Sequence, residues 1–202
     1  LGVVSVDLDT EEVELEAAAK WSRKKAVVRK GVRLGDVARV RRGIATGSNS
    51  FFVISEARRK ELGIPKKQLR PCLTSPRVFA GLELTASNLD AFDKDVPRWL
   101  LNVATPGMEA SETPFGEYLR EGMAAKVNEG YLASKRKPWY SPEQRGDCPI
   151  VFSYFNRARP RFVRNRANAI PLNNWLIIEP KPGVDADVLY EALTNEATMR
   201  QL

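Results

Sequence analysis

The chain has 202 residues, of which 43% are hydrophobic and 28% are charged, and its net charge is +7. This length suits one domain, or one domain with an appended segment, and the apolar content is enough to fill a core. The sequence has no histidine and two cysteines, Cys72 and Cys148, whose spacing matches no zinc-ligand pattern. The composition therefore excludes Ser-His-Asp and Cys-His catalysis, and it predicts no catalytic or metal site in this chain.

The N-terminal segment predicts a connector rather than a targeting signal. Residues 1–10 lack the basic region of a signal peptide, and no stretch of the chain approaches the roughly 18 apolar residues of a membrane helix. We therefore expect a cytoplasmic protein with reduced cysteines and no membrane partner. Because the chain starts at Leu1 without an initiator Met, we expect residues 1–25 to connect it to a preceding part of a longer protein, and residues 26–202 to form the domain.

The first predicted elements follow this connector. Residues 26–34 combine β-branched side chains with a glycine and predict a strand or a hairpin edge. Residues 43–49 form a glycine-flanked loop, and residues 50–54, Ser-Phe-Phe-Val-Ile, predict a buried strand. We interpret this region as a strand, a turn and a second strand.

Helix signals occupy the middle of the chain. Ser55 is placed to cap a short helix over 56–62. A short apolar strand is expected over 98–103, and Thr113 followed by Pro114 predicts the start of a helix that continues to about residue 130. The apolar face expected for this helix consists of Phe115, Tyr118, Leu119 and Gly122.

The last third of the chain predicts three strands and a closing helix. The strands are expected over 150–155, 159–164 and 174–179, and either Asp185 or Asp187 caps the helix. The inward residues expected on that helix are Val188, Leu189, Ala192, Leu193 and Met199. Strands mixed irregularly with short helices predict an α+β fold with a mixed, mostly antiparallel sheet and short flanking helices.

Charge is unevenly distributed along the sequence. Residues 1–19 carry only acidic charges, whereas residues 20–42 carry ten basic residues and one acidic residue, Asp36. A second basic block runs from Lys135 to Arg166. If the fold brings the two blocks together, they form an electropositive face that suits a polyanion. The alternative is a basic surface that is evenly solvated.

The first candidate binding segment is the glycine-flanked loop with the arginines before it. Glycines allow backbone N–H groups to approach a phosphate closely, and the arginines supply positive charge. The order of residues matches neither a Walker A loop nor a dinucleotide-binding fingerprint. The side chains expected near a nucleic acid are Arg41, Arg42, Thr46, Ser48 and Asn49. The alternative is an ordinary hairpin loop.

The second candidate segment is a short run in which basic residues precede two aromatic residues. Such residues can pair with phosphates and stack on a base or a sugar. The candidates are Lys135, Arg136, Lys137 and Trp139. The alternative is that Trp139 and Tyr140 are packing residues in the core or at its rim.

The third candidate segment is the turn between the strands predicted over 150–155 and 159–164. Asn156, Arg157 and Arg159 are expected to project outward from this turn. Arginine suits bidentate contacts to guanine or phosphate, and asparagine suits adenine. Strand alternation sends Phe162 to the core and Arg161 and Val163 to the opposite face. The alternative is a solvated hairpin tip.

A series of short motifs, in consistent order along residues 20–202, resembles the C-terminal region of N6-adenine DNA methyltransferases of the Eco57I and TaqI kind. Those enzymes belong to type II and type IIG restriction–modification systems. The run from Arg42 to Phe52 is the most specific element. The other motifs are Gly35 to Ala38, Val53, Gly130-Tyr131, Arg136, Pro138 to Tyr140, Ile150 to Tyr154, Arg161 to Val163, Asn165, Ala169-Ile170 and Leu189 to Asn195.

The resemblance implies that residues 26–202 are a target recognition domain, which reads double-stranded DNA in the major groove. It implies an N-terminal methyltransferase domain in the same chain, to which residues 1–25 connect and which binds S-adenosylmethionine. The family's Asn-Pro-Pro-Tyr/Phe motif and its glycine-rich cofactor motif are absent from this sequence. We therefore expect neither cofactor binding nor methylation by this chain alone. Two alternatives stay open, namely a separate specificity subunit and a general RNA- or protein-binding module.

Overall fold

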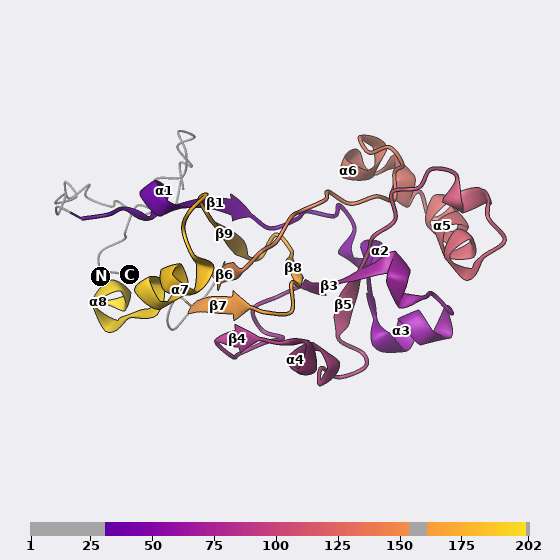
Figure 1. Cartoon of the computed structure of the whole chain (residues 1–202). Coiled ribbons are helices and arrows are strands. Elements are labelled where there is room, and N and C mark those ends of the chain that lie inside the picture. Colours follow the sequence, from indigo (N-terminus) through magenta and orange to yellow (C-terminus); the bar gives the residue numbers. More distant parts are fainter. Residues whose placement is uncertain (1–30, 154–160, 201–202) are drawn as a thin grey trace, which may run out of the picture.

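Two β-sheets with short helices around them make up the protein, and the computed structural model describes residues 31–153 and 161–200 (Figure 1). The first sheet contains, in spatial order, β1 (Ala38–Arg42), β9 (Leu176–Pro180), β6 (Ile150–Ser153), β7 (Arg161–Asn165) and β4 (Glu83–Leu84). The second sheet contains β2 (Val53–Ser55), β5 (Pro97–Leu101), β3 (Leu69–Leu73) and β8 (Ile170–Pro171). Strand pairs are antiparallel except β4–β7 and β3–β8. The expected mixed, mostly antiparallel α+β fold is confirmed, with its strands divided between two sheets.

The helices are short. They are α1 (Leu34–Val37), α2 (Asn49–Phe52), α3 (Glu56–Glu61), α4 (Ala86–Asp90), α5 (Pro114–Ala124), α6 (Tyr131–Ser134), α7 (Ala186–Thr194) and α8 (Glu196–Met199). Three predicted helix starts are confirmed, because local side chains cap them: Ser55 Oγ accepts from Arg58 N, Thr113 accepts from Gly116 N, and Asp185 accepts from two backbone N–H groups. None of the helices in the described ranges is long and apolar enough to cross a membrane.

The middle of the first sheet, around β6 and β7, is covered on both faces. Apolar side chains of β1, β6, β7 and β9 pack against Leu189, Tyr190 and Leu193 of α7 on one face. On the other face, Val151 and Val163 pack with Trp175 and with residues around β4 and α4. The sequence had assigned Phe162 alone to the core, but Val163 is fully buried as well, because a sheet between two layers needs apolar residues at successive positions.

The second sheet packs against α2 and α5. The stacked rings of Phe51 and Tyr118 lie with their centroids 4.6 Å apart, and the Tyr118 hydroxyl donates to the Phe51 carbonyl at 2.7 Å. Phe52 and Leu119 are fully buried in the same cluster. The predicted apolar face of α5 is confirmed, although the helix ends at Ala124 rather than near residue 130.

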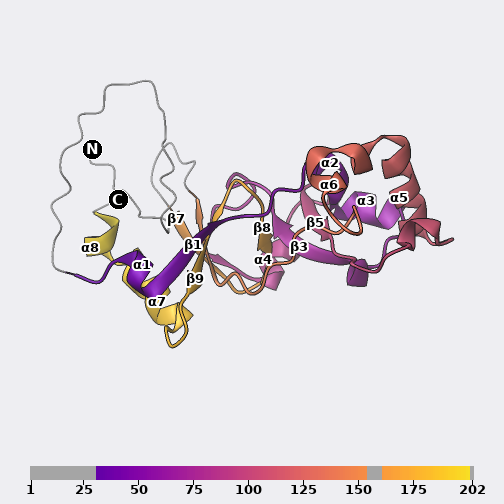
Figure 2. The ribbon, with the colours of Figure 1, turned by 90° about the horizontal axis from the view of Figure 1, so that it is seen from above.

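The chain passes repeatedly between the two sheets, so neither sheet is built from one continuous stretch. It leaves the first sheet after β1, forms β2 and β3 in the second, and returns for β4. It visits the second sheet again for β5 and β8, and the first for β6, β7 and β9. Figures 1 and 2 show the two sheets side by side in an elongated molecule, with α7 and α8 at one end and α5 at the other.

Two sequence predictions of secondary structure were wrong in the residues that the structure describes. No strand spans 31–34 in the described part of the predicted 26–34 strand, and Leu34 starts α1. Ser50, Phe51 and Phe52 belong to α2, so β2 begins only at Val53. A strand is present on each side of the loop, as β1 and β2, but α2 lies between the loop and β2, and the strands form no hairpin, because β1 pairs with β9 and β2 pairs with β5.

The inward face predicted for the last helix was partly wrong. Val188 is 68% exposed and Ala192 is exposed, whereas Tyr190 is buried. The Tyr190 hydroxyl donates to the Leu82 carbonyl at 3.0 Å, which explains how a polar aromatic residue is accommodated at the buried position.

Candidate nucleic-acid interface

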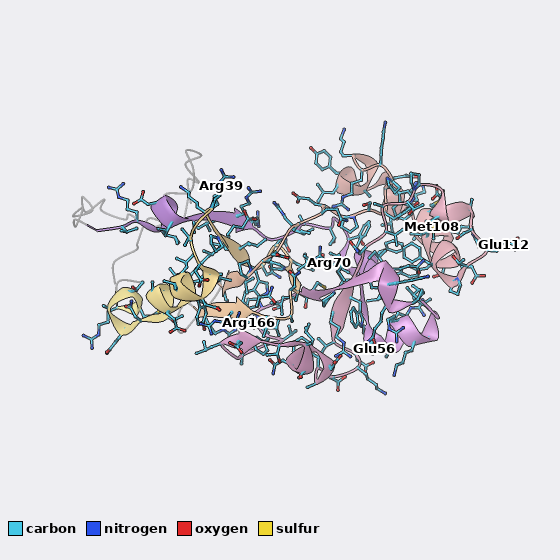
Figure 3. All side chains as sticks on the ribbon, viewed as in Figure 1. Arg39, Glu56, Arg70, Met108, Glu112 and Arg166 are labelled. Carbon is cyan, nitrogen blue, oxygen red and sulfur yellow. The ribbon has the colours of Figure 1, made fainter. Side chains whose placement is uncertain are left out.

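Strand β1 presents three arginines at the edge of the first sheet. Ala38 and Val40 pack into the cluster that contains α7, so strand alternation directs Arg39 and Arg41 to the opposite face. Arg39, Arg41 and Arg42 are all exposed, and the same alternation places Arg42 on the face of Val40, so the three arginines lie around the edge of the sheet. Arg41 Nε lies 3.0 Å from Glu179 Oε2 on the neighbouring strand, and Arg42 Nε donates to the Asn173 carbonyl at 3.5 Å. Figure 3 shows Arg39 on the side of the molecule away from Arg166 and Glu56.

The loop after β1 begins with a close backbone contact that only glycine permits. A Cβ atom on Gly43 would lie 2.2 Å from the Leu172 carbonyl oxygen. The Gly43 N–H donates to the Trp175 carbonyl, and the Ile44 N–H donates to the Pro171 carbonyl, each at 2.9 Å. The loop therefore starts from a position that the backbone around β8 determines, with the Ile44 side chain buried.

Within the loop, a buried threonine organises the polar side chains. Thr46 is 1% exposed, and its hydroxyl donates to Asn49 Oδ1 at 2.6 Å while accepting from the Ser48 N–H at 3.2 Å. Gly47 has a φ of +90°, in the left-handed region that favours glycine. Thr46 thus offers almost no surface to a ligand and shapes the loop, whereas Ser48 and Asn49 reach the surface.

Arg136 joins the second candidate segment to this loop. Its guanidinium group donates to the Thr46 carbonyl at 2.9 Å and to the Ala45 carbonyl at 2.8 Å, and lies 5.3 Å from the centre of the Phe52 ring. Burial lowers the pKa of Arg136, but arginine stays protonated in proteins. The structure thus brings together two predicted segments that are far apart in sequence, and Arg136 is the residue that holds them together.

The aromatic residues of the second segment are packing residues. Tyr140 is fully buried, and its hydroxyl donates to the Thr105 carbonyl at 2.6 Å and accepts from the Met108 N–H at 3.1 Å. Trp139 is half-buried, with its ring centre 5.6 Å from that of Phe51. Packing of both rings in the core, the alternative stated from the sequence, accounts for their positions. A contact between Trp139 and DNA stays a prediction.

The second basic block does not stay together in the fold. Arg164 pairs with Glu83, Asp187 and Glu191, and Arg166 pairs with Asp187. Arg161 donates to three backbone carbonyls, those of Pro76, Phe79 and Ala80. These arginines stabilise the protein's own structure, and Arg145 pairs with Glu143. Among the described residues of this block, Lys135 and Lys137 are left to extend the positive surface formed by β1. Asn156, Arg157 and Arg159 lie outside the described residues.

The exposed polar side chains of β1, the loop and the segment after α6 form what we call the basic surface. β1 and α6 lie along the upper side of the molecule in the view of Figure 1. Among the residues that the structure describes, no acidic partner neutralises Arg39, Arg42, Lys135 or Lys137. The members of the basic surface are Arg39, Arg41, Arg42, Ser48, Asn49, Lys135 and Lys137.

Sequence reasoning named most of these residues but omitted Arg39. The signal for it was present, because the alternation in Ala38-Arg39-Val40-Arg41 places both arginines on one face of a strand. The alternation alone does not place Arg39 at a binding surface, because the sequence does not show that this face of the strand is left uncovered at the edge of the sheet.

The cysteine and acidic side chains of the described residues form no metal-ligand cluster, and two surface depressions lack groups that an adenosyl cofactor needs. No group of three cysteine, aspartate or glutamate side chains gathers anywhere in the ranges that the structure describes. One surface depression of about 290 Å³, beside Gln68 and Asn102, has no acidic residue to bind ribose hydroxyls. A second, of about 330 Å³, beside Asn165 and Asn168, has no aromatic residue to stack on adenine. We therefore derive no chemical step from this chain.

Comparisons with known proteins give a consistent result. A family model described as type II methyltransferase M.Eco57I, C-terminal domain, matches residues 8–201. The chain is 34% identical over 170 residues to the type II methyltransferase M.AccI of Acinetobacter calcoaceticus, covering 82% of this chain and 31% of that protein. It is 24% identical over 192 residues to the type II methyltransferase M.XamI of Xanthomonas campestris pv. amaranthicola, covering 92% of this chain and 35% of that protein. The chain thus spans about a third of the length of these relatives.

Proposed function

The chain belongs to the family of type II methyltransferase M.Eco57I C-terminal domains, and we propose that it recognises double-stranded DNA for a methyltransferase of a restriction–modification system. The basic surface carries this proposal. It gathers positive side chains from β1 and from the segment after α6, of which only Arg41 pairs with an acidic side chain, that of Glu179, among the described residues. Such a surface attracts a polyanion and positions it by phosphate contacts.

The roles within the basic surface follow from the chemistry of its residues. Arg39, Arg42, Lys135 and Lys137 contact phosphates and set the register of the duplex. Ser48 and Asn49, at the exposed end of the loop, are the candidates for contacts to base edges. The hydrogen bond from Thr46 to Asn49 supports this assignment, because it orients the amide that would meet a base.

A titration with salt tests the proposal. If these four cationic side chains each neutralise one phosphate, log–log plots of affinity against salt concentration have a slope of about −3.6. The double variant Arg39→Ala, Arg42→Ala is expected to lower duplex affinity and to reduce the magnitude of the slope by about 1.8. Lys60→Ala is the matched control, because this exposed lysine lies in α3, away from the basic surface (Figure 1).

Two results would contradict the proposal. One is the absence of duplex binding at low salt. The other is equal duplex affinity in the wild-type chain and the double variant. The arginines would then have the role that basic residues often have on edge strands, which is to prevent edge-to-edge pairing. RNA at matched salt serves as a competitor, and a preference for RNA would favour a general RNA-binding module.

The rest of the reaction belongs to a part of the protein outside this chain. We propose an N-terminal methyltransferase domain in the same protein, which binds S-adenosylmethionine and methylates adenine at N6. The length of the two relatives supports this arrangement, because each is a type II methyltransferase about three times as long as the matched region. The two free, buried cysteines support a cytoplasmic location.

Methylation of duplex DNA, measured with labelled S-adenosylmethionine, tests the division of roles. The longer protein is expected to transfer methyl groups to adenine, and the chain alone is expected to transfer none. Transfer by the chain alone would contradict it. Transfer by a separate polypeptide that requires this chain would indicate a specificity subunit instead.

A further inference from the structure

Tyr131 is an aromatic residue that the fold leaves almost wholly in solvent. It is 77% exposed, whereas Phe51, Phe52, Tyr118 and Tyr140 nearby are buried. An isolated exposed apolar side chain is ordinary. Tyr131 differs in its position, because it begins α6 beside the basic surface.

α6 holds Tyr131 on a firmly anchored support. Ala133 is 3% exposed and belongs to the core cluster around the second sheet. The next residue but one after the helix, Arg136, donates to the two loop carbonyls described above. Leu132 lies against the loop itself, since a Cβ atom on Gly47 would be 3.1 Å from Leu132 Cβ. The contacts of the following residues thus fix Tyr131 in place next to the loop.

A cation already lies beside the ring. Lys135 Nζ is 5.9 Å from the centre of the Tyr131 ring, and Lys135 is itself exposed. An ammonium group next to an exposed ring is the combination that binds a nucleotide unit, because the cation pairs with the phosphate and the ring packs against the attached sugar or base. The position of the pair beside the basic surface, rather than the pair alone, favours a nucleic acid over a protein partner with an acidic surface.

We propose that Tyr131 and Lys135 together bind one nucleotide unit of the DNA backbone, with the ring against the deoxyribose and the ammonium group on its phosphate. In duplex DNA the bases are stacked on one another, so the sugar is the part of the nucleotide that an exposed ring on the protein surface meets first. The inference rests on the proposed function. It adds to that function an apolar, sequence-independent contact at α6.

The test measures affinity for a pool of randomised duplexes across a series of salt concentrations. Tyr131→Ala is expected to weaken binding by about 5- to 10-fold, at the low end of the loss for a base stacked on an aromatic ring because the ring here packs against a sugar. The salt slope should stay unchanged, because no charge is removed. Tyr131→Phe is expected to bind like the wild type, because the ring is kept. Lys135→Ala is expected to reduce the magnitude of the salt slope by about 0.9.

Met123→Ala is the matched control, because Met123 is an exposed apolar residue of α5, 42% exposed, outside the basic surface. Its affinity should equal that of the wild type. The melting temperature of each variant should match that of the wild type, since the side chains of Tyr131, Lys135 and Met123 are all exposed.

The outcomes separate the inference from the proposed function. If the wild-type chain binds no duplex, the proposed function is contradicted, and the inference, which rests on it, is contradicted too. A wild-type chain that binds with the expected salt slope, alongside a Tyr131→Ala variant of equal affinity, overturns the inference alone. A Tyr131→Phe variant as weak as Tyr131→Ala also overturns it, because the hydroxyl rather than the ring would then make the contact.

Discussion

Replacement of Arg136 separates its role inside the protein from a role in DNA binding. Truncation to alanine removes two hydrogen bonds from a charged donor, at 2.9 and 2.8 Å, and the contact with the Phe52 ring. The carbonyls of Ala45 and Thr46 lose their guanidinium partner. Because Thr46 is buried, solvent replaces the lost bond poorly there.

The expected cost follows from these contacts. A hydrogen bond to a charged group contributes about 1.5–3 kcal/mol, and a cation over an aromatic ring contributes about 0.5–1 kcal/mol when exposed. The exposed Ala45 carbonyl regains water, so the total stays below the full sum. We expect Arg136→Ala to lower the free energy of unfolding by about 2–4 kcal/mol. At this chain length the melting temperature should fall by roughly 4–16 °C.

Chemical denaturation and duplex binding, measured on the same variants, check this prediction. Lys137→Ala is the matched control. Its side chain is exposed and forms no ion pair in the described part of the chain, so its free energy of unfolding should change by less than about 0.5 kcal/mol. Its salt slope in DNA binding should lose about 0.9 in magnitude. An Arg136→Ala variant with unchanged stability and reduced DNA affinity would refute the reasoning, because Arg136 would then contact DNA rather than hold the loop.

Two further predictions concern stability. Gly43→Ala should destabilise the protein by about 3 kcal/mol, since the new Cβ would lie 2.2 Å from the Leu172 carbonyl oxygen. Gly146→Ala is the control and should change the stability little, because a Cβ there would have no atom within 4 Å. Equal melting temperatures of the two variants would contradict the close contact at Gly43. The hydrogen bond from Arg59 lowers the pKa of Glu56 from 4.5 to about 2, so the ionised group stabilises the fold above pH 4.5 and this contribution is lost as the pH falls towards 2. When the free energy of unfolding is measured between pH 4.5 and pH 2, the wild type should lose up to about 3 kcal/mol more than Glu56→Gln. Parallel curves for the wild type and Glu56→Gln would contradict the role of the ionised carboxylate.

Helix starts were the part of the fold most accessible from the sequence. Ser55, Thr113 and Asp185 each cap a helix through bonds to backbone groups at most three residues away. Such bonds depend on neighbours in the chain, so the sequence pattern contains the required information. The α+β class was equally accessible, because it follows from the mixture of strand and helix patterns.

The sequence pattern did not predict which strands pair with each other or which arginines are engaged within the protein. Residues 50–52 resemble a strand by composition, yet the fold makes them a helix that places Phe51 against Tyr118. Arg136 and Lys137 are adjacent and alike in sequence, but one is bound to loop carbonyls and the other is exposed. The difference depends on contacts across 90 residues of chain.

The family of the chain, its positive charge and its lack of histidine follow from the sequence alone. Which of the positive charges are available to a ligand depends on the tertiary structure. Arg161, Arg164 and Arg166 are engaged by carbonyls and carboxylates, whereas Arg39 and Lys135 remain open at the surface. The physical reason is that a charge is available only where no partner from elsewhere in the chain neutralises it, and the pairing of distant strands sets those partners.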